Sequence, residues 1–185
     1  MEEIWLLSLI ADHCYRGRSN VFFRAVLGNQ GFDAQILDRS SGPEKVSPIE
    51  FTQAAYDEEM YHRMLYMKEH GHVPLTGAII KAGTKRRGIA VEAVLEAVDH
   101  DRGGSAQFEK IEQAARRKAE GERLPETRLG IVYEGLHISG QEDFERLRDL
   151  AVQRLTPLLA RFAHLYLIRS EGDHVLQFSL KNPAT

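Results

Sequence analysis

Two segments in the middle of the chain carry side chains that could do chemistry. The stretch GIAVEAVLEAVDHD (residues 88–101) places the carboxylate of Glu92 within a run of apolar residues. A carboxylate on a buried strand could help to hold a divalent cation, which makes Glu92 the candidate catalytic residue. The segment 81–87 contains no acid, and its clustered cations could contact phosphates. The candidate nucleic-acid-binding residues are therefore Lys81, Lys85, Arg86 and Arg87.

Histidines and the single cysteine offer weaker chemistry. His70 and His72 flank a glycine, and Asp99, His100 and Asp101 are adjacent, but no third ligand can be placed beside either set. We therefore expect no metal site. Cys14 is the only cysteine, which excludes an internal disulfide and a cysteine-based zinc site. A nucleophilic cysteine would need a base and an oxyanion hole, and the sequence indicates neither.

Composition is that of an ordinary globular protein. The chain has 185 residues, of which 43% are hydrophobic and 28% charged, and its net charge is −3. This length suits a single domain over residues 1–185 with a core of its own. Because the whole chain is not a polycation, contact with nucleic acid would have to use a local basic patch. The apolar run at 4–10 lacks the basic flank of a signal peptide and is too short to span a membrane. We therefore expect a cytoplasmic protein with no membrane partner.

The N-terminal part has the pattern of a β-meander. The apolar run IWLLSLI (4–10) and the β-rich runs 21–27 and 32–38 are separated by turn residues, which predicts three antiparallel strands. The loop RSSGPEKVSP (39–48) is the best internal boundary. It divides the domain into an N-terminal β-meander at 1–40 and an α/β core at 47–185.

The remainder alternates helices and strands. Ser47 can cap a helix that begins near Pro48 and runs to about residue 69, and the turn DRGGS (101–105) precedes a second helix that ends before Gly121. A strand at 129–136, a helix at 140–155 and a hairpin of two strands at 164–169 and 174–180 follow. Alternation of this kind indicates a sheet with parallel members. The fold class is α/β, with α+β as the alternative: an N-terminal antiparallel meander followed by a mixed sheet with packed helices.

The structure of residues 88–101 decides between two interpretations. Val91, Val94, Leu95 and Val98 have helical spacing, but Gly88 and the pair Gly103-Gly104 bound a possible strand at 89–95, which we favour slightly. The helical alternative would give residues 75–95 the form of a helix-turn-helix, with a turn at Gly83 and the basic residues at the start of the second helix.

With 89–94 as a strand, a family resemblance emerges. The order VPLTGAII (73–80), IAVEAV (89–94), SAQFEKIEQAARRK (105–118) and RLGIVYEG (128–135) resembles the core of the PD-(D/E)XK nuclease-like fold. That family places an acid after a helix and turn, then a strand with an acid-x-Lys triad, then a helix and another strand. Its acids hold Mg²⁺ and its lysine supports the attacking water. Here Leu75 follows the proline in place of the acid, and Val94 stands in place of the lysine, so the resemblance implies a degenerate catalytic motif.

Three functions follow from these expectations. The first is a nuclease-like protein without standard nuclease activity or cofactor that binds nucleic acid, or a protein partner, through the basic segment. The second is a structural or interaction module that forms a homo-oligomer. The third is a metal-dependent hydrolase with a rearranged site, the only alternative that requires Mg²⁺.

Overall fold

The computed structural model describes residues 2–26, 28, 31–55, 57–74, 78–82, 90–94, 100–121, 124–135 and 137–180. The chain forms two compact units. Unit 1 comprises residues 1–54 and 107–185, and unit 2 comprises residues 55–106. The loop expected as the internal boundary instead joins two neighbouring strands of one sheet in unit 1.

The apolar run at 4–10 is part of a helix, which corrects the prediction of a strand. Helix α1 spans Glu2–Cys14 and buries Leu6, Leu7 and Ile10 against the sheet. The buried positions differ by one and four residues, which is helical spacing. A short, continuous apolar run cannot by itself distinguish a buried helix from a buried strand, and packing on the sheet selects the helix here.

An antiparallel meander follows α1, one strand later than expected. Strands β1 (Val21–Ala25), β2 (Ala34–Asp38) and β3 (Lys45–Gln53) pair in sequence order. The helix predicted from Pro48 is therefore wrong over residues 48–53, which belong to β3. Pro48 is tolerated because β3 pairs with β6 only from Ile49 onward, so the strand at Pro48 is bonded on one side only.

The second half of unit 1 adds the parallel strands that helix-strand alternation predicted. Strand β6 (Arg128–Tyr133) pairs in parallel with β3 and with β7 (His164–Arg169), and β8 (Val175–Ser179) closes the sheet antiparallel to β7. The six-stranded order is β1-β2-β3-β6-β7-β8. The α/β class, with its meander and mixed sheet, is thus confirmed.

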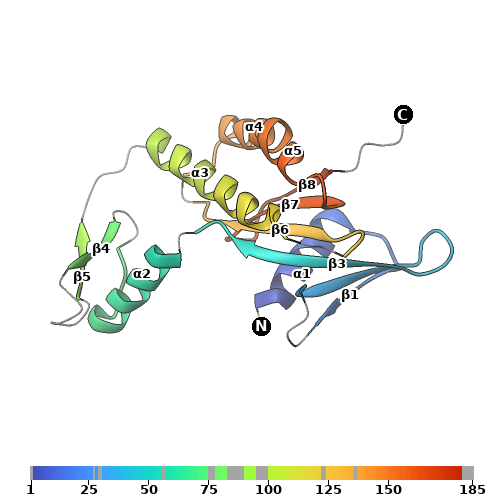
Figure 1. Cartoon of the computed structure of the whole chain (residues 1–185), viewed down its shortest axis with the longest axis horizontal. Helices are drawn as coiled ribbons and strands as arrows, with labels where there is room; N and C mark the ends of the chain where they lie inside the picture. The colour runs from blue at the N-terminus through green and yellow to red at the C-terminus, as the bar shows by residue number, and fades with distance from the viewer. Residues whose placement is uncertain are drawn as a thin grey trace. The chain divides into compact units, whose positions relative to one another are not determined.

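Helices cover both faces of this sheet (Figure 1). Helix α3 (His100–Ala119), helix α4 (Gln141–Leu150), a π-helical turn at Ala151–Leu155 and α5 (Thr156–Leu158) lie on one face, and α1 lies on the other. Two apolar clusters fill the space on either side, one around Ile131 and Leu167 and the other around Ile36 and Ile168. The glycines of DRGGS are buried within α3 and do not form the predicted turn.

A buried cation ties the α1 side of the sheet together. Arg128 donates from Nη1 to the hydroxyls of Tyr15 and Tyr166, the latter at 2.9 Å, and from Nη2 to the hydroxyl of Ser47 at 3.3 Å. The two tyrosine hydroxyls lie 3.0 Å apart and are hydrogen-bonded to each other. The two phenol oxygens thus accept from Nη1 of the guanidinium, whereas its buried Nε has no hydrogen-bond partner in the residues that the structure describes.

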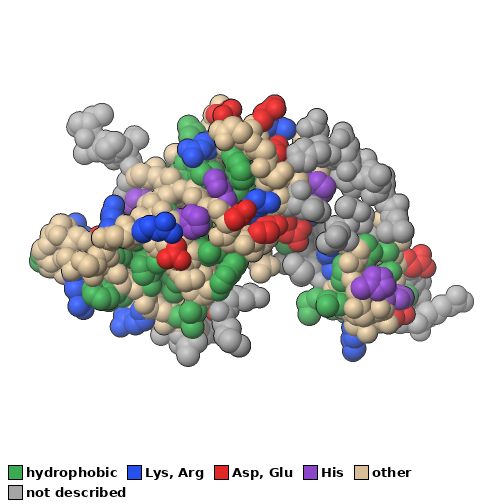
Figure 2. Space-filling model, turned by 180° about the vertical axis from the view of Figure 1, so that it is seen from behind, with side chains coloured by type: hydrophobic (Ala, Val, Ile, Leu, Met, Phe, Trp, Pro, Cys, Tyr) green, Lys and Arg blue, Asp and Glu red, His purple; other side chains and the backbone are tan. Residues whose placement is uncertain are grey.

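Unit 2 contains α2 (Asp57–His70), β4 (Ala78–Ala82) and β5 (Ala90–Val94). The strands form an antiparallel hairpin with Ile80 opposite Glu92. The strand interpretation of residues 88–101 is therefore confirmed over 90–94, and the helix-turn-helix alternative is wrong because both of its described segments are strands. Unit 2 exposes green hydrophobic side chains and purple histidines at its surface (Figure 2).

Candidate active site

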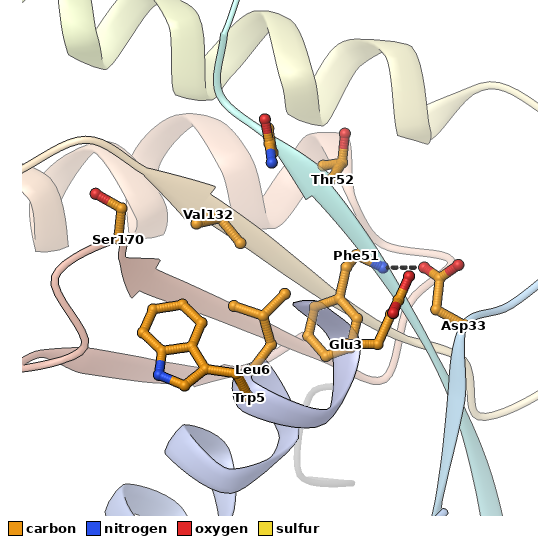
Figure 3. Close-up of a pocket in the computed structure, with 9 residues that line it drawn as sticks. Glu3, Trp5, Leu6, Asp33, Phe51, Thr52, Val132 and Ser170 are labelled. Atoms are coloured by element: carbon orange, nitrogen blue, oxygen red, sulfur yellow. Dashed lines mark hydrogen bonds between the residues drawn. The ribbon is translucent and has the colours of Figure 1, made fainter. Parts of the chain in front are cut away.

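The best-formed polar site of unit 1 lies where β2 begins and β3 ends. Asp33 immediately precedes β2, and its backbone N–H donates to the carbonyl oxygen of Ile49 at 3.0 Å. Its side-chain Oδ2 accepts the backbone N–H of Phe51 at 2.6 Å (Figure 3). The carboxylate of Asp33 is therefore fixed against β3 at the residue that follows Glu50.

Glu50 is a second carboxylate, on β3, but its side chain lies on the α3 face of the sheet, whereas Phe51 and the Asp33 site lie on the α1 side. Its side chain is buried on β3, with 5% of the residue exposed. Lys118, near the end of α3, donates from Nζ to Oε2 of Glu50 at 3.2 Å. A buried carboxylate remains charged only if it is paired or hydrogen-bonded, and the ammonium supplies that pairing. The helix that connects β3 to β6 thus delivers a lysine to an acid in the strand.

A cavity of about 530 Å³ adjoins Asp33. It lies near the carboxyl ends of the parallel strands, because Gln53 ends β3, Val132 is next to last in β6 and Ser170 follows β7. In open α/β sheets this edge is the usual place for a ligand. The cavity is lined by Glu3, Trp5, Leu6, Asp33, Phe51, Thr52, Gln53, Val132 and Ser170 (Figure 3).

Two glycines set the positions of the aromatic rings in this lining. A Cβ on Gly130 would lie 2.5 Å from Cδ1 of Phe51, its partner across the β3–β6 pair. A Cβ on Gly172 would lie 3.0 Å from Cζ2 of Trp5, and Gly172 has a φ of +82°. Glycine at both positions therefore lets the rings lie directly on the backbone.

The site residues expected from the sequence lie elsewhere. Glu92 is exposed on β5 of unit 2, and β5 pairs with β4 and not with the core sheet. The nuclease-like order requires the strand that carries Glu92 to pair in parallel with β6. The strand that pairs in this way is β3, although β5 is the strand that directly precedes α3 in the chain. Lys81 is exposed on β4. Lys85, Arg86 and Arg87 lie outside the described residues.

The histidines and the cysteine do not form a second site. Nδ1 of His72 lies 3.0 Å from the carbonyl oxygen of His70, and the rings of Tyr66 and His70 are tilted by 36° with centroids 4.2 Å apart. Within the described part of the chain, no three His, Cys, Asp or Glu residues are grouped to hold a metal ion. Burial raises the pKa of the Cys14 thiol to about 11, so it is protonated at neutral pH and is a poor nucleophile.

Asp33, Glu50 and Lys118 were missed because residues 48–53 were assigned to a helix. The signal was present in the sequence: Asp33 directly precedes AQILD, and Glu50 stands inside the apolar run SPIEF. With 45–53 assigned as a strand, the two acids fall on adjacent strands or at their ends. Lys118 carried no such signal, because only the path of α3 brings it to β3.

Comparisons with protein-family models, curated proteins and solved structures found no match to this chain. Among the described residues, no helix combines the length and apolar character needed to cross a membrane.

Proposed function

We propose that unit 1 is a nuclease-like core and that the protein is a metal-dependent phosphodiester hydrolase with a rearranged site. The proposed site residues are Asp33, Glu50 and Lys118. The observation that carries the proposal is the contact at 3.2 Å between Lys118 Nζ and the buried carboxylate of Glu50.

The order of elements supports the proposal in part. The nuclease-like pattern requires an acid after a helix and turn, then an acid on a strand, then a helix and another strand. Unit 1 matches this order only from the second acid onward, with Glu50 on β3 and then α3 and β6, because β1 separates Asp33 from α1 and unit 2 is inserted between β3 and α3. The position two residues after Glu50 holds Thr52 where the pattern has lysine, and Lys118 from α3 would take that role.

The donor set fits a hard divalent cation. Mg²⁺ commonly binds through one or two carboxylates and completes its shell with water and substrate phosphate, so a group of three protein ligands is not required. Glu50 would supply a carboxylate from the α3 side of β3, and Asp33 would supply one from the edge where β2 meets β3. When bound, Mg²⁺ would supply charge for the phosphoryl oxygens and lower the pKa of an attacking water.

The protein groups would then have distinct roles. The hydrogen bond from the Phe51 amide fixes one oxygen of Asp33 and so orients its carboxylate. Lys118 would hold the attacking water and would balance the negative charge of Glu50. Hydrolysis joins the water oxygen to phosphorus, breaks the bond from phosphorus to the leaving sugar oxygen, and transfers a proton to that oxygen.

A cleavage assay with end-labelled single strands, plain duplex and duplex with an unpaired flap tests the proposal. We expect cleavage with Mg²⁺ that EDTA abolishes, and no appreciable cleavage of plain duplex DNA. Asp33→Asn and Glu50→Gln should each lower the rate by about 100-fold or more, because each removes a ligand charge. Lys118→Arg should keep the ion pair but lose most activity, because a planar guanidinium does not replace a compact ammonium.

Two further variants make the assay specific. Glu92→Gln separates the two candidate sites. This variant should cleave as the wild type does if the site is at Asp33 and Glu50, and it should lose cleavage if the site is on β5. Glu145→Gln removes an exposed carboxylate from α4 and serves as the matched control. Activity that survives in Glu50→Gln, or that is absent on every substrate with Mg²⁺ and Mn²⁺, would overturn the hydrolase proposal.

A nuclease-like core that binds without cleaving is the second candidate. The exposure of Lys81 on β4 favours it, because the basic segment 81–87 then starts at an accessible surface. In this case the wild-type protein should bind oligonucleotides, and Asp33→Asn and Glu50→Gln should bind equally well.

An interaction module is the third candidate. Tyr61, Met64 and Met67 on α2 are 50%, 65% and 57% exposed, and exposed aromatic and methionine side chains are common at protein interfaces. Sedimentation equilibrium over a range of concentrations tests whether the chain forms a homo-oligomer.

A further inference from the structure

The cavity beside Asp33 has a chemical character that the proposed hydrolysis does not use. Trp5 on α1 is 43% exposed, a large fraction for the largest apolar side chain, and it lines the cavity with Phe51 (Figure 3). The cavity volume of about 530 Å³ is within the range of small-molecule sites. An aromatic ring at the wall of such a cavity offers a surface on which a planar group can stack.

The charged groups of the lining select against anions. Glu3 and Asp33 both line the cavity, and Glu3 directs its carboxylate toward Asp33 (Figure 3). A backbone hydrogen bond at the start of α1, together with the hydrogen bond and charge of the N-terminal ammonium, lowers the pKa of Glu3, so its carboxylate is ionised at neutral pH. The described lining residues include no lysine, arginine or histidine. A phosphate would be repelled, whereas a neutral group that donates hydrogen bonds would be accepted.

We propose that this cavity binds one unpaired nucleobase that carries an exocyclic amino group: cytosine, adenine or guanine. The base would stack on Trp5 and donate its amino hydrogens to Glu3, or to Asp33 when no cation is bound there, as carboxylates accept from cytosine N4 elsewhere. This inference rests on the proposed function and narrows its substrate to nucleic acid with unpaired nucleotides. Thymine and uracil have no exocyclic amino group and bind less well.

The side chains beside the acids suit such a base. Thr52 and Gln53 from β3 and Ser170 after β7 each bring a hydroxyl or amide to the same cavity. These groups can donate or accept, so they can serve the carbonyl oxygens and ring nitrogens that the carboxylates cannot. The strand would leave its phosphates outside the cavity.

Trp5 gives a direct readout, because it is the only tryptophan of the chain. Its fluorescence should be followed while decamers of dC or dT are added to the full chain in EDTA, which prevents cleavage. We expect quenching that saturates with dC and binding about ten-fold weaker with dT, the size of one hydrogen-bonded base contact. If the site binds a base within a strand, free cytidine should displace the dC decamer only at far higher concentration than unlabelled decamer does. Equal potency of cytidine and decamer would overturn the assignment to a strand.

Variants separate stacking from folding. Trp5→Phe retains a ring and should bind dC decamers nearly as well as the wild type, whereas Trp5→Leu retains apolar packing without a ring and should bind about ten-fold more weakly by anisotropy. Asp33→Asn should narrow the preference for dC over dT, because an amide both donates and accepts. Phe22→Ala removes another exposed aromatic of unit 1 and is the matched control.

The outcomes distinguish this inference from the hydrolase proposal. Equal binding of dC and dT with no change in Trp5 fluorescence would overturn the base site, even if cleavage depends on Glu50. Quenching by dC in a protein that cleaves nothing would support the base site and leave the chain as a nucleic-acid binder. The base site would also be overturned if the Trp5→Leu variant bound and cleaved nucleic acid as the wild type does.

Discussion

Lys118 on α3 and Glu50 on β3 form an ion pair of 3.2 Å between residues that are 68 positions apart in the sequence. The two side chains differ in exposure, at 30% for Lys118 and 6% for Glu50. The acid is therefore committed to the interior, while the ammonium retains contact with water. This asymmetry lets the pair stabilise the fold while the ammonium stays accessible to water.

The pair should show strong energetic coupling. We expect Lys118→Met to lower the free energy of unfolding by about 1–3 kcal/mol, less than the roughly 3–5 kcal/mol for a fully buried pair because Lys118 is partly solvated. Glu50→Gln should cost less, since no buried charge remains, and the double variant should recover part of the destabilisation caused by Lys118→Met. Urea denaturation of the four proteins of this cycle measures the coupling.

The surface pair Arg39–Glu44 provides the control for that cycle. Its Nε–Oε2 distance is only 2.6 Å, but its side chains are 57% and 35% exposed. Its coupling should stay below about 1 kcal/mol, as for other surface pairs. Equal coupling for the two pairs would mean that the burial of Glu50 adds nothing.

Alkaline pH should destabilise the fold through its buried tyrosines. Burial raises the pKa of Tyr133 and of Tyr166 well above the usual value of about 10. Between that value and the raised pKa, the unfolded chain loses protons that the folded chain keeps, so stability falls as pH rises. Each tyrosine contributes about 1.4 kcal/mol per pH unit in this window, and stability from these groups is fully present below about pH 10.

Urea midpoints between about pH 8 and pH 11 measure this effect, because this range brackets the ordinary tyrosine pKa. Tyr133→Phe should reduce the alkaline slope by about 1.4 kcal/mol per pH unit. It removes a buried hydroxyl without a hydrogen-bond partner, so its stability near neutral pH should hardly fall. Tyr61→Phe, which removes an exposed hydroxyl, should leave the slope unchanged. A slope that is identical in all three proteins would refute the assignment to Tyr133.

The sequence predicted the second half of unit 1 better than the first, for a physical reason. Helix α4 and strands β6, β7 and β8 were each identified because their periodicity and turn residues agree, as in the hairpin around Gly172. Local signals and the tertiary fold point to the same structure there. The parallel pairing of β6 followed from the alternation of helices and strands alone.

The prediction for the first half of unit 1 was wrong at two segments, because their local composition favours a structure that differs from the one selected by packing in the fold. The run at 4–10 has no charged position to mark a face, and Trp5 and Ile4 remain exposed although both are apolar. The segment at 45–53 contains Pro48, which suits a helix start, yet one-sided pairing accommodates it in β3. These two errors hid Asp33 and Glu50 as candidates and left Glu92, which lies on β5 of unit 2, as the candidate catalytic residue.

Gly130 should control the shape of the candidate site. Alanine at this position would bring a methyl group to within 2.5 Å of the Phe51 ring, which must then move toward the cavity or tilt. We expect Gly130→Ala to lower stability by about 1–3 kcal/mol, the usual cost of overpacking, and to weaken binding of dC decamers. Phe51→Leu in the same chain should restore stability but not binding, which separates packing from recognition.

The basic segment should reveal its role through salt. If Lys81, Lys85, Arg86 and Arg87 contact phosphates, each contact releases condensed counterions, and affinity for duplex or single-stranded DNA falls steeply with ionic strength. Replacing Lys85, Arg86 and Arg87 with alanine should lower the magnitude of the log–log salt slope on duplex DNA by about two to three units, since each phosphate that is no longer neutralised accounts for about 0.9.

A control triple of Arg16, Lys45 and Arg148, all exposed in unit 1, removes the same charge and should change the slope much less if the contacts are local. In the control triple, whose three positions are exposed, each substitution should change stability by less than about 0.5 kcal/mol. Equal slopes for the two triples would assign the salt dependence to net charge and leave segment 81–87 without a specific role, whereas a selective decrease would make it the surface that brings nucleic acid to the protein.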